Sequence, residues 1–127
     1  LDIAKMIDIK PIYFDLGKYA IRKDAKIELD KIVKVMNDYP KMVIELGSHT
    51  DCRSSATSNL SLSDKRAKAS ADYIKKLISN PERINGKGYG ESKLKNACAC
   101  EGAVKSTCSE IEHQENRRTE FIILKSE

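Results

Sequence analysis

Residues that could carry chemistry gather in two parts of the chain. Residues 49–52 hold a histidine, an aspartate and a cysteine, and residues 98–108 hold the other three of the four cysteines. Cysteines in such groups serve as disulfide cross-links, as metal ligands or as nucleophiles. Disulfides would place the chain in an oxidising compartment, either outside the cell or in the periplasm.

A metal site and a thiol nucleophile are the less favoured uses of these residues. The candidate zinc ligands come from distant segments and include no C-x-x-C pair. A nucleophile at Cys52 would need His49, an orienting acid and an oxyanion hole, and the sequence shows no further sign of them. We therefore predict no metal, no cofactor and no enzymatic activity. The candidate zinc ligands are His49, Cys52, Cys98, Cys100, Cys108 and His113.

Disulfides are the favoured use, and the sequence alone allows more than one pairing. Cys98 and Cys108 bracket a short loop that contains a glycine, so we predict that they pair. Cys100 would then pair with Cys52 and tie the long loop to residues 49–52. The rival pairing joins Cys100 to Cys108 and Cys52 to Cys98, and the residues leave both open.

Length and composition describe one small globular domain. The chain has 127 residues, of which 40% are hydrophobic and 33% are charged, so we expect a single domain over residues 1–127. The net charge of +4 includes no lysine or arginine block, which argues against nucleic acid as a partner. No apolar run approaches the length of a transmembrane helix. Because the chain begins at Leu1 without an initiator methionine, it reads as an excised part of a longer protein.

Two amphipathic helices are predicted. Apolar residues recur at helical spacing over residues 25–36 and again over residues 67–78. Pro40 and Pro81 follow these stretches and stop the helices. The second stripe includes small residues, which would let that helix lie close to a sheet. Its candidate N-caps are Asn59, Ser61 and Ser63.

Four strands are predicted from β-rich segments, at residues 9–15, 42–48, 84–90 and 118–125. Gly88 and Gly90 in the third strand indicate close backbone packing rather than a phosphate loop. Residues 91–116 form a long loop before the last strand, and loops of that length are usually functional or tied down. The order of elements predicts a two-layer α/β domain with helices on one face of a mixed sheet.

Five short motifs carry a resemblance to a known family. They are Ile12-Tyr13-Phe14-Asp15, Ser48-His49-Thr50-Asp51, the N-x-x-L-S-x-x-R-A pattern from Asn59 to Ala67, Gly88-Tyr89-Gly90-Glu91 and Asn116-Arg117-Arg118. In this order they resemble the OmpA-like C-terminal domain, a peptidoglycan-binding module also present in Pal lipoproteins and flagellar stator proteins. The match spans nearly the whole chain. The insertion with the cysteines resembles the version found in Bacteroidetes-type members.

The resemblance implies a fold and a ligand. The fold is α/β, a two-layer α+β sandwich of element order βαβαββ, with a mixed four-stranded sheet in the order 1-4-2-3 and helices on one face. The ligand is the diaminopimelate residue of the peptidoglycan stem. In that family, an aspartate and an arginine matching Asp51 and Arg66 hold the ammonium and the carboxylate of the ligand's zwitterionic end. Secondary contacts would come from Thr50, Asn59, Asp15 and Arg117.

Other readings of the same residues stay open. Without the resemblance, Asp51 and Arg66 could form no more than a surface ion pair. Alternation along a strand points Arg117 and Arg118 at opposite faces, so that one would line the pocket and the other would be solvated. Ser54 replaces a glycine that many relatives carry, which predicts a different shape for the loop after Asp51.

The function implied by the resemblance is non-covalent binding of peptidoglycan, which would anchor the outer membrane to the cell wall. The domain would lie in the periplasm, joined to a barrel or a lipid anchor through an N-terminal region outside this sequence. The alternative is a protein–protein adaptor that has the OmpA-like fold but has lost wall binding. The sequence leaves a homo-oligomer open.

Overall fold

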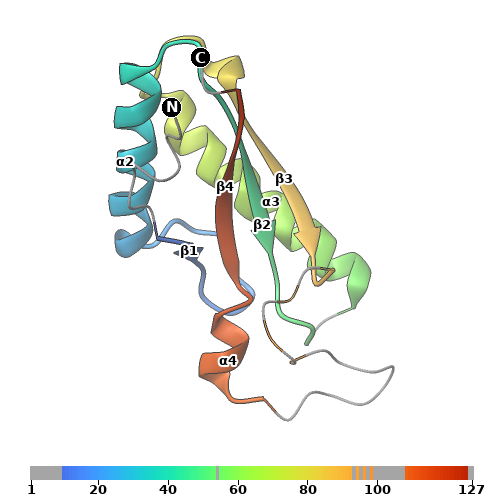
Figure 1. The fold of residues 1–127 in the computed structure, drawn as a ribbon. Helices are drawn as coiled ribbons and strands as arrows, with labels where there is room; N and C mark the ends of the chain where they lie inside the picture. Colours follow the sequence, from blue (N-terminus) through green and yellow to red (C-terminus); the bar gives the residue numbers. More distant parts are fainter. Residues whose placement is uncertain are drawn as a thin grey trace.

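A computed structural model describes residues 10–53, 55–92, 94, 96, 98 and 108–125 of the chain. Four strands and two long helices make up most of it, as the hydrophobic pattern predicts (Figure 1). The elements in chain order are β1 (Ile12–Tyr13), α2 (Lys23–Asp38), β2 (Val43–His49), α3 (Ala56–Lys75), the short 3₁₀ helix η1 (Pro81–Arg83), β3 (Ile84–Gly90), α4 (Glu110–Gln114) and β4 (Arg118–Lys125).

The strands form one mixed sheet in the order β1-β4-β2-β3. The β2 strand runs parallel to β3 and antiparallel to β4, and β4 also pairs antiparallel with β1. The order 1-4-2-3 implied by the resemblance is therefore confirmed. Because β2 and β4 are antiparallel, the end of β2 lies beside the start of β4, where Ser48 pairs with Thr119.

Both long helices cover the same face of the sheet, and one hydrophobic core lies between them and the strands (Figure 1). The core takes alternate residues of each strand, because successive side chains in a strand point to opposite faces. Phe121 and Ile123 of β4 pack against this core, whereas Ile122 and Leu124 are exposed on the other face. Its fully buried large residues include Phe14, Leu29, Ile32, Met36, Leu46 and Ile74.

The α3 helix lies unusually close to β3, and two glycines make this possible. A Cβ atom on Gly86 would lie 2.4 Å from the carbonyl oxygen of Ala67, and one on Gly88 would lie 2.4 Å from the backbone nitrogen of Asp64. The amide of Gly88 donates instead to the Asp64 carboxylate at 2.8 Å. The predicted close backbone packing is confirmed, and it fixes the position of α3 and of the side chains on it.

Several element boundaries differ from the sequence prediction, three of them in ways that matter for the site. The first strand is shorter than residues 9–15, since only Ile12–Tyr13 pairs with β4 among the described residues. The α3 helix begins earlier than predicted, because Ser55 is its N-cap and its side chain accepts a hydrogen bond from the amide of Ser58. The predicted long loop contains the short helix α4, which begins with a capping box formed by Ser109 and Glu112.

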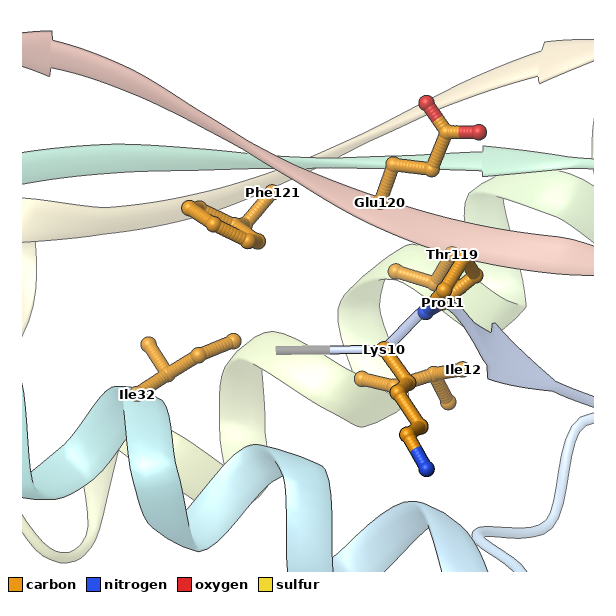
Figure 2. Close-up of a pocket in the computed structure, with 7 residues that line it drawn as sticks. All are labelled: Lys10, Pro11, Ile12, Ile32, Thr119, Glu120 and Phe121. Carbon is orange, nitrogen blue, oxygen red and sulfur yellow. The ribbon is translucent and has the colours of Figure 1, made fainter. Parts of the chain in front are cut away.

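One cavity of about 190 Å³ opens between α2 and β4 (Figure 2). It contains none of the predicted site residues. Its lining residues are Lys10, Pro11, Ile12, Ile32, Thr119, Glu120 and Phe121. Within the described part of the chain, no helix has the length and apolar character needed to cross a membrane.

Candidate ligand-binding site

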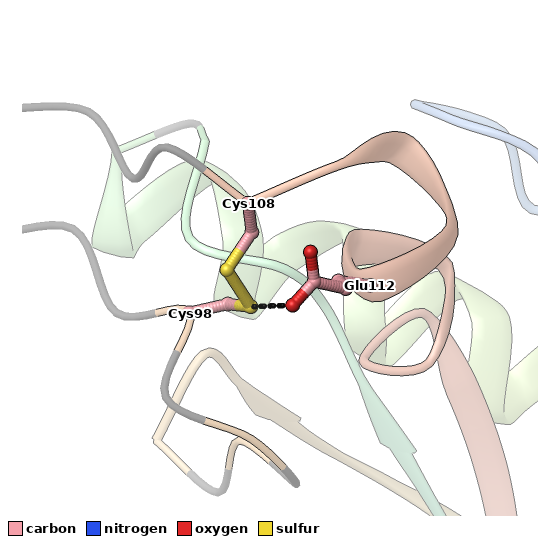
Figure 3. Close-up of side chains that lie close together, drawn as sticks. All are labelled: Cys98, Cys108 and Glu112. Carbon is pink, nitrogen blue, oxygen red and sulfur yellow. Dashed lines mark hydrogen bonds between the residues drawn. A yellow bond between two sulfur atoms is a disulfide. The ribbon is translucent and has the colours of Figure 1, made fainter.

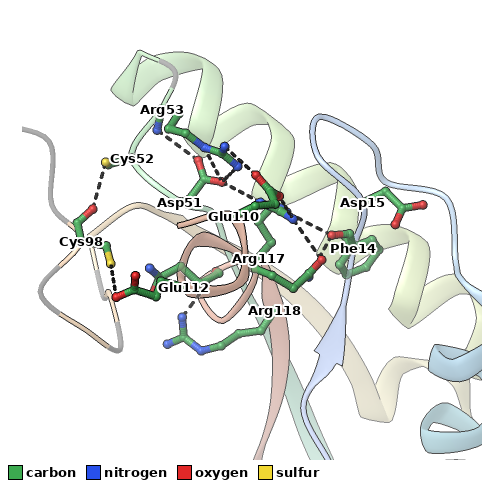
Figure 4. Close-up of polar contacts among 12 residues, drawn as sticks. Phe14, Asp15, Asp51, Cys52, Arg53, Cys98, Glu110, Glu112, Arg117 and Arg118 are labelled. Atoms are coloured by element: carbon green, nitrogen blue, oxygen red, sulfur yellow. Dashed lines mark hydrogen bonds and ion pairs between the residues drawn. The ribbon is translucent and has the colours of Figure 1, made fainter. Parts of the chain in front are cut away.

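Charged side chains gather at the end of the sheet where β2 stops and β4 starts (Figure 4). Asp51 follows β2 by two residues, and Arg117 directly precedes β4. The antiparallel pairing of these two strands brings the two residues together, although they are 66 positions apart in the chain. Their side chains form a buried ion pair, with Arg117 Nη1 at 3.0 Å from Asp51 Oδ2.

The Asp51 carboxylate accepts four hydrogen bonds. Its Oδ1 atom accepts the backbone amide of Arg53 at 3.0 Å. Its Oδ2 atom accepts Arg53 Nη2 at 2.8 Å, Arg53 Nε at 3.2 Å and Arg117 Nη1 at 3.0 Å. Burial by itself would raise the pKa of Asp51, but the hydrogen bonds from Arg53 and Arg117 outweigh it and hold this pKa below its ordinary value. Asp51 is therefore an ionised carboxylate at neutral pH.

Arg66 is fully buried, with an exposed fraction of 0%. Its guanidinium donates to three backbone carbonyl oxygens: Lys18 at 2.8 Å from Nε, Asp15 at 3.1 Å from Nη2 and His49 at 3.3 Å from Nη1. It also lies over the Phe14 ring, 5.2 Å from the ring centroid. Among the described residues, no carboxylate forms a salt bridge with it, so the alternative of a mere surface ion pair with Asp51 is wrong.

The environment of Arg66 disfavours its own charge. Burial, and next the positive charge of Arg117, lower the pKa of Arg66 to about 10, and the negative charge of Asp51 offsets part of this effect. The side chain still carries its proton at neutral pH. A buried cation held only by neutral carbonyl groups is energetically costly, and an anion brought to it would be stabilised strongly.

Two residues of this cluster escaped the sequence analysis, namely Arg53 and Glu110. Arg53 bridges the two carboxylates, because its Nη1 atom donates to Glu110 Oε2 at 2.8 Å while its Nη2 and Nε atoms donate to Asp51. Glu110 also accepts Arg117 Nη2 at 2.6 Å. The hydrogen bonds with Asp51 and Glu110 raise the pKa of Arg53, and those from Arg53 and Arg117 lower the pKa of Glu110.

The charges of this cluster do not balance. Three arginines, at positions 53, 66 and 117, face the carboxylates of Asp51 and Glu110. Among the described residues this leaves one positive charge in excess, and Arg66 is the member that no carboxylate pairs.

The secondary contacts named from the resemblance lie in different surroundings. Thr50 is buried beside Asp51, and its Oγ1 atom has no hydrogen-bond partner among the described residues. Asp15 contributes its backbone carbonyl to Arg66, while its own carboxylate is largely exposed and lies 3.4 Å from Arg22. Asn59 is buried in α3 and donates to Glu91 at 3.0 Å. Of the predicted set, the structure pairs the side chains of Asp51 and Arg117, and it brings Arg66 against the backbone carbonyl of Asp15.

Arg118 was expected to be the solvated partner of Arg117. The two side chains do point in different directions, as Figure 4 shows. However, the Arg118 side chain is only 5% exposed and pairs with Glu120. The prediction of opposite directions is right and that of a solvated charge is wrong, since Glu120 and the Asn116 carbonyl provide partners for Arg118 within the fold.

Cys98 and Cys108 form a disulfide, as predicted (Figure 3). The rival pairing of Cys98 with Cys52 is therefore wrong. Cys52 is also disulfide-bonded, and its predicted partner, Cys100, lies outside the described residues, as does Ser54. The Cys52 sulfur lies 3.0 Å from the Cys98 carbonyl oxygen, so Cys98 lies beside the segment that carries Asp51 (Figure 4).

Disulfide bonding prevents Cys52, Cys98 and Cys108 from acting as thiolates. Glu112 Oε2 lies 4.0 Å from the Cys98 sulfur, but a disulfide sulfur carries no proton, so this approach is a contact and not a hydrogen bond. The group formed by Cys98, Cys108 and Glu112 cannot bind a metal through thiolates while its two sulfur atoms are bonded to each other. A disulfide-bonded Cys52 likewise has no thiol to act as a nucleophile.

Comparison with known proteins agrees with this architecture. Residues 13–107 match the OmpA family. A peptidoglycan-associated lipoprotein of Rhizobium meliloti (strain 1021) is 32% identical over 87 residues, which are 68% of this chain and 49% of the relative. The photosystem I P700 chlorophyll a apoprotein A2 of Gloeobacter violaceus is 33% identical over 112 residues, which are 88% of this chain and 12% of that protein.

A solved structure shows the same fold. The peptidoglycan-associated lipoprotein from Burkholderia pseudomallei superimposes with a TM-score of 0.75 at 22% sequence identity, over 90% of this chain and 89% of that chain. The mixed sheet with both helices on one face thus forms a two-layer α/β domain with the fold of that lipoprotein. The chain belongs to the OmpA family, as its motifs predicted.

The family relationship also bears on the class of function. The chain spans about half the length of the lipoprotein relative and a smaller part of the photosystem protein. The lipoproteins are named for an association with peptidoglycan and not for a reaction. The names of the lipoprotein relatives thus agree with the prediction of a non-enzymatic domain.

Proposed function

We propose that this domain binds peptidoglycan non-covalently through the zwitterionic end of the diaminopimelate residue in the peptide stem. The observation that carries the proposal is the buried guanidinium of Arg66, which no carboxylate of the described residues pairs. The name of the lipoprotein relatives, which refers to peptidoglycan, supports the choice of ligand.

The proposed chemistry uses one fixed cation and one fixed anion. The ligand carboxylate would supply the anion that Arg66 lacks, and the ligand ammonium would donate to Asp51. Arg117 would position Asp51 through the 3.0 Å ion pair. The unpartnered hydroxyl of Thr50 would offer one further hydrogen bond beside them. Because a zwitterion needs both charges at a matching distance, this pair of residues would select it over a simple anion or cation.

The biological role that follows is anchoring of the outer membrane to the cell wall. The chain would form one domain over residues 1–127, the C-terminal part of a longer periplasmic protein whose N-terminal region reaches the outer membrane. Many copies of the ligand in the wall would raise the apparent affinity of a moderate site. The mass of the protein in solution would show whether it forms a homo-oligomer.

Calorimetric titration with a diaminopimelate-containing stem peptide tests the ligand. We expect binding by the wild-type domain, and loss of binding in Asp51→Asn and in Arg66→Lys. Asp24→Asn is the matched control, because Asp24 also pairs with an arginine but lies on the exposed surface of α2. A stem peptide with lysine in place of diaminopimelate lacks the second carboxylate, and it should bind at least about tenfold more weakly, the equivalent of one charge-assisted hydrogen bond.

Circular dichroism of each variant distinguishes a loss of binding from a loss of folding. Equal affinity of wild type and Asp51→Asn for the stem peptide would refute the assignment of Asp51 to the binding site. Equal affinity for the two stem peptides would remove diaminopimelate as the recognised group but keep the wall as a partner. No heat with any stem peptide, together with no retention on purified sacculi, would favour the protein–protein adaptor.

A further inference from the structure

The proposed ligand-binding groups are closed off from solvent in this structure. The residues Asp51, Arg66 and Arg117 are 4%, 0% and 3% exposed. The outer members of the same cluster are Arg53 and Glu110, whose side chains are 27% and 57% exposed. A ligand that approaches from solvent therefore meets Arg53 and Glu110 first.

We propose that Arg53, held by Glu110, is a lid that occupies the ammonium position on Asp51 and must be displaced before the ligand binds. This inference rests on the proposed function, since it concerns the same site. In the closed state the guanidinium of Arg53 stands in for the ligand ammonium. In the open state its side chain has left Asp51, and the path to Asp51 and Arg66 is free.

The hydrogen-bond capacity of Asp51 is the first argument. Each carboxylate oxygen offers about two acceptor positions. Asp51 Oδ2 accepts three hydrogen bonds, two of them from the Arg53 side chain, while Oδ1 accepts the Arg53 backbone amide. An ammonium that donates to Oδ2 must therefore take over positions that Arg53 fills. Arg117 is buried and tied to the Phe14 carbonyl and to Gln114, so Arg53 is the partner that can leave.

The position of Glu110 is the second argument. Glu110 begins the short helix α4, and its carboxylate accepts both Arg53 and Arg117. Its bond to Arg53 Nη1 at 2.8 Å holds the guanidinium over Asp51. The backbone amide of Arg53 is bonded to Asp51 Oδ1, so displacement of the lid requires movement of the side chain but not of this backbone. A half-exposed carboxylate can follow such a movement at low cost.

A lid of this kind reduces the apparent affinity by the fraction of molecules that are open. Removal of the Arg53 side chain should therefore tighten binding and speed association. An open fraction of about one tenth, typical of a minor conformational state, would give a gain of about tenfold. A residue that contacts the ligand directly would give the opposite result when removed.

The test is the association rate and affinity of stem peptide for the wild-type domain and for Arg53→Ala, measured by stopped-flow mixing and calorimetry. The lid predicts faster association and about tenfold tighter binding by Arg53→Ala. Lys34→Ala is the control for loss of one positive charge, because Lys34 is exposed and remote from the site, and it should leave both quantities unchanged. Equal or weaker binding by Arg53→Ala would overturn the lid.

A double-mutant cycle with Glu110→Gln separates the lid from simple charge effects. If Glu110 acts by holding Arg53, Glu110→Gln speeds association in the wild-type background and has little effect in the Arg53→Ala background. An equal effect in both backgrounds would mean that only the charge of Glu110 matters, and would overturn its role in the lid. If neither wild type nor Arg53→Ala binds, the proposed function fails as well. If wild type binds, Asp51→Asn does not, and Arg53→Ala shows no gain, the lid alone is rejected.

Discussion

Removal of the charge of Asp51 should have a large and pH-dependent effect on the stability of the domain. Asp51→Asn keeps the shape of the side chain but removes the buried one of the two carboxylates that pair with Arg117, whose side chain is 4% exposed. Breaking one buried ion pair in this way costs about 3 kcal/mol or more. The partly exposed pair with Arg53 adds about 1 kcal/mol. We expect a total loss of about 4 kcal/mol at pH 7, out of the 5–15 kcal/mol typical of a domain.

Urea unfolding followed by circular dichroism measures this loss. With an m-value of about 1.5 kcal/mol per M, the midpoint for Asp51→Asn should fall by roughly 2.5 M. The exposed control Asp24→Asn should lose about 1 kcal/mol or less. The domain remains folded at low urea concentration, so the binding tests on Asp51→Asn are interpretable.

The dependence on pH follows from the lowered pKa of Asp51. A carboxylate whose pKa is lower in the folded than in the unfolded state stabilises the fold at pH values above the unfolded pKa of about 3.9. That contribution is lost as the pH falls through the folded pKa. The difference between wild type and Asp51→Asn should thus be full at pH 7 and should decline as the pH falls below about 3.9, so that it is smaller at pH 3. A loss below about 1 kcal/mol at pH 7, or the same loss at both pH values, would refute the assignment of Asp51 as a buried ionised carboxylate.

Two further predictions concern residues that stabilise the fold outside the site. Arg83→Met should lower the free energy of unfolding by about 3 kcal/mol in urea, because the buried Arg83 guanidinium donates to four backbone carbonyls. Three of these carbonyls lie at the end of α2 and just beyond it. A loss no larger than that of Arg22→Met would contradict this role. Replacing both Cys98 and Cys108 by serine should cost about 3 kcal/mol through the freed loop, and unchanged stability of this double variant would show that the cross-link adds nothing to the fold.

Much of the fold could be predicted because its signals are local. The apolar periodicity located α2, and the β-rich segments at residues 84–90 and 118–125 match β3 and β4 as the structure has them. Boundaries that depend on a single cap were less accurate, as the start of α3 at Ala56 shows. The capping box of Ser109 and Glu112 was a readable sign of α4 inside the long loop, since its S-x-x-E spacing marks a helix start.

The site was only partly predictable. Its motif residues Asp51, Arg66 and Arg117 could be named because their sequence context resembles a family. Arg53 and Glu110 could not, because an ion pair between residues 57 positions apart leaves no trace in either segment. The burial of Arg118 was missed for a similar reason, since alternation along a strand gives the direction of a side chain but not what covers it.

The amino-acid sequence by itself determined the elements, their order and the family, because helix and strand periods and short motifs are properties of neighbouring residues. Only the tertiary structure decided how the charges meet. Antiparallel pairing of β2 with β4 places Arg117 against Asp51, and the close approach of α3 to β3 buries Arg66 among backbone carbonyls. Among the described residues, the result is a cluster with one buried positive charge in excess, a property that no single segment of the chain contains.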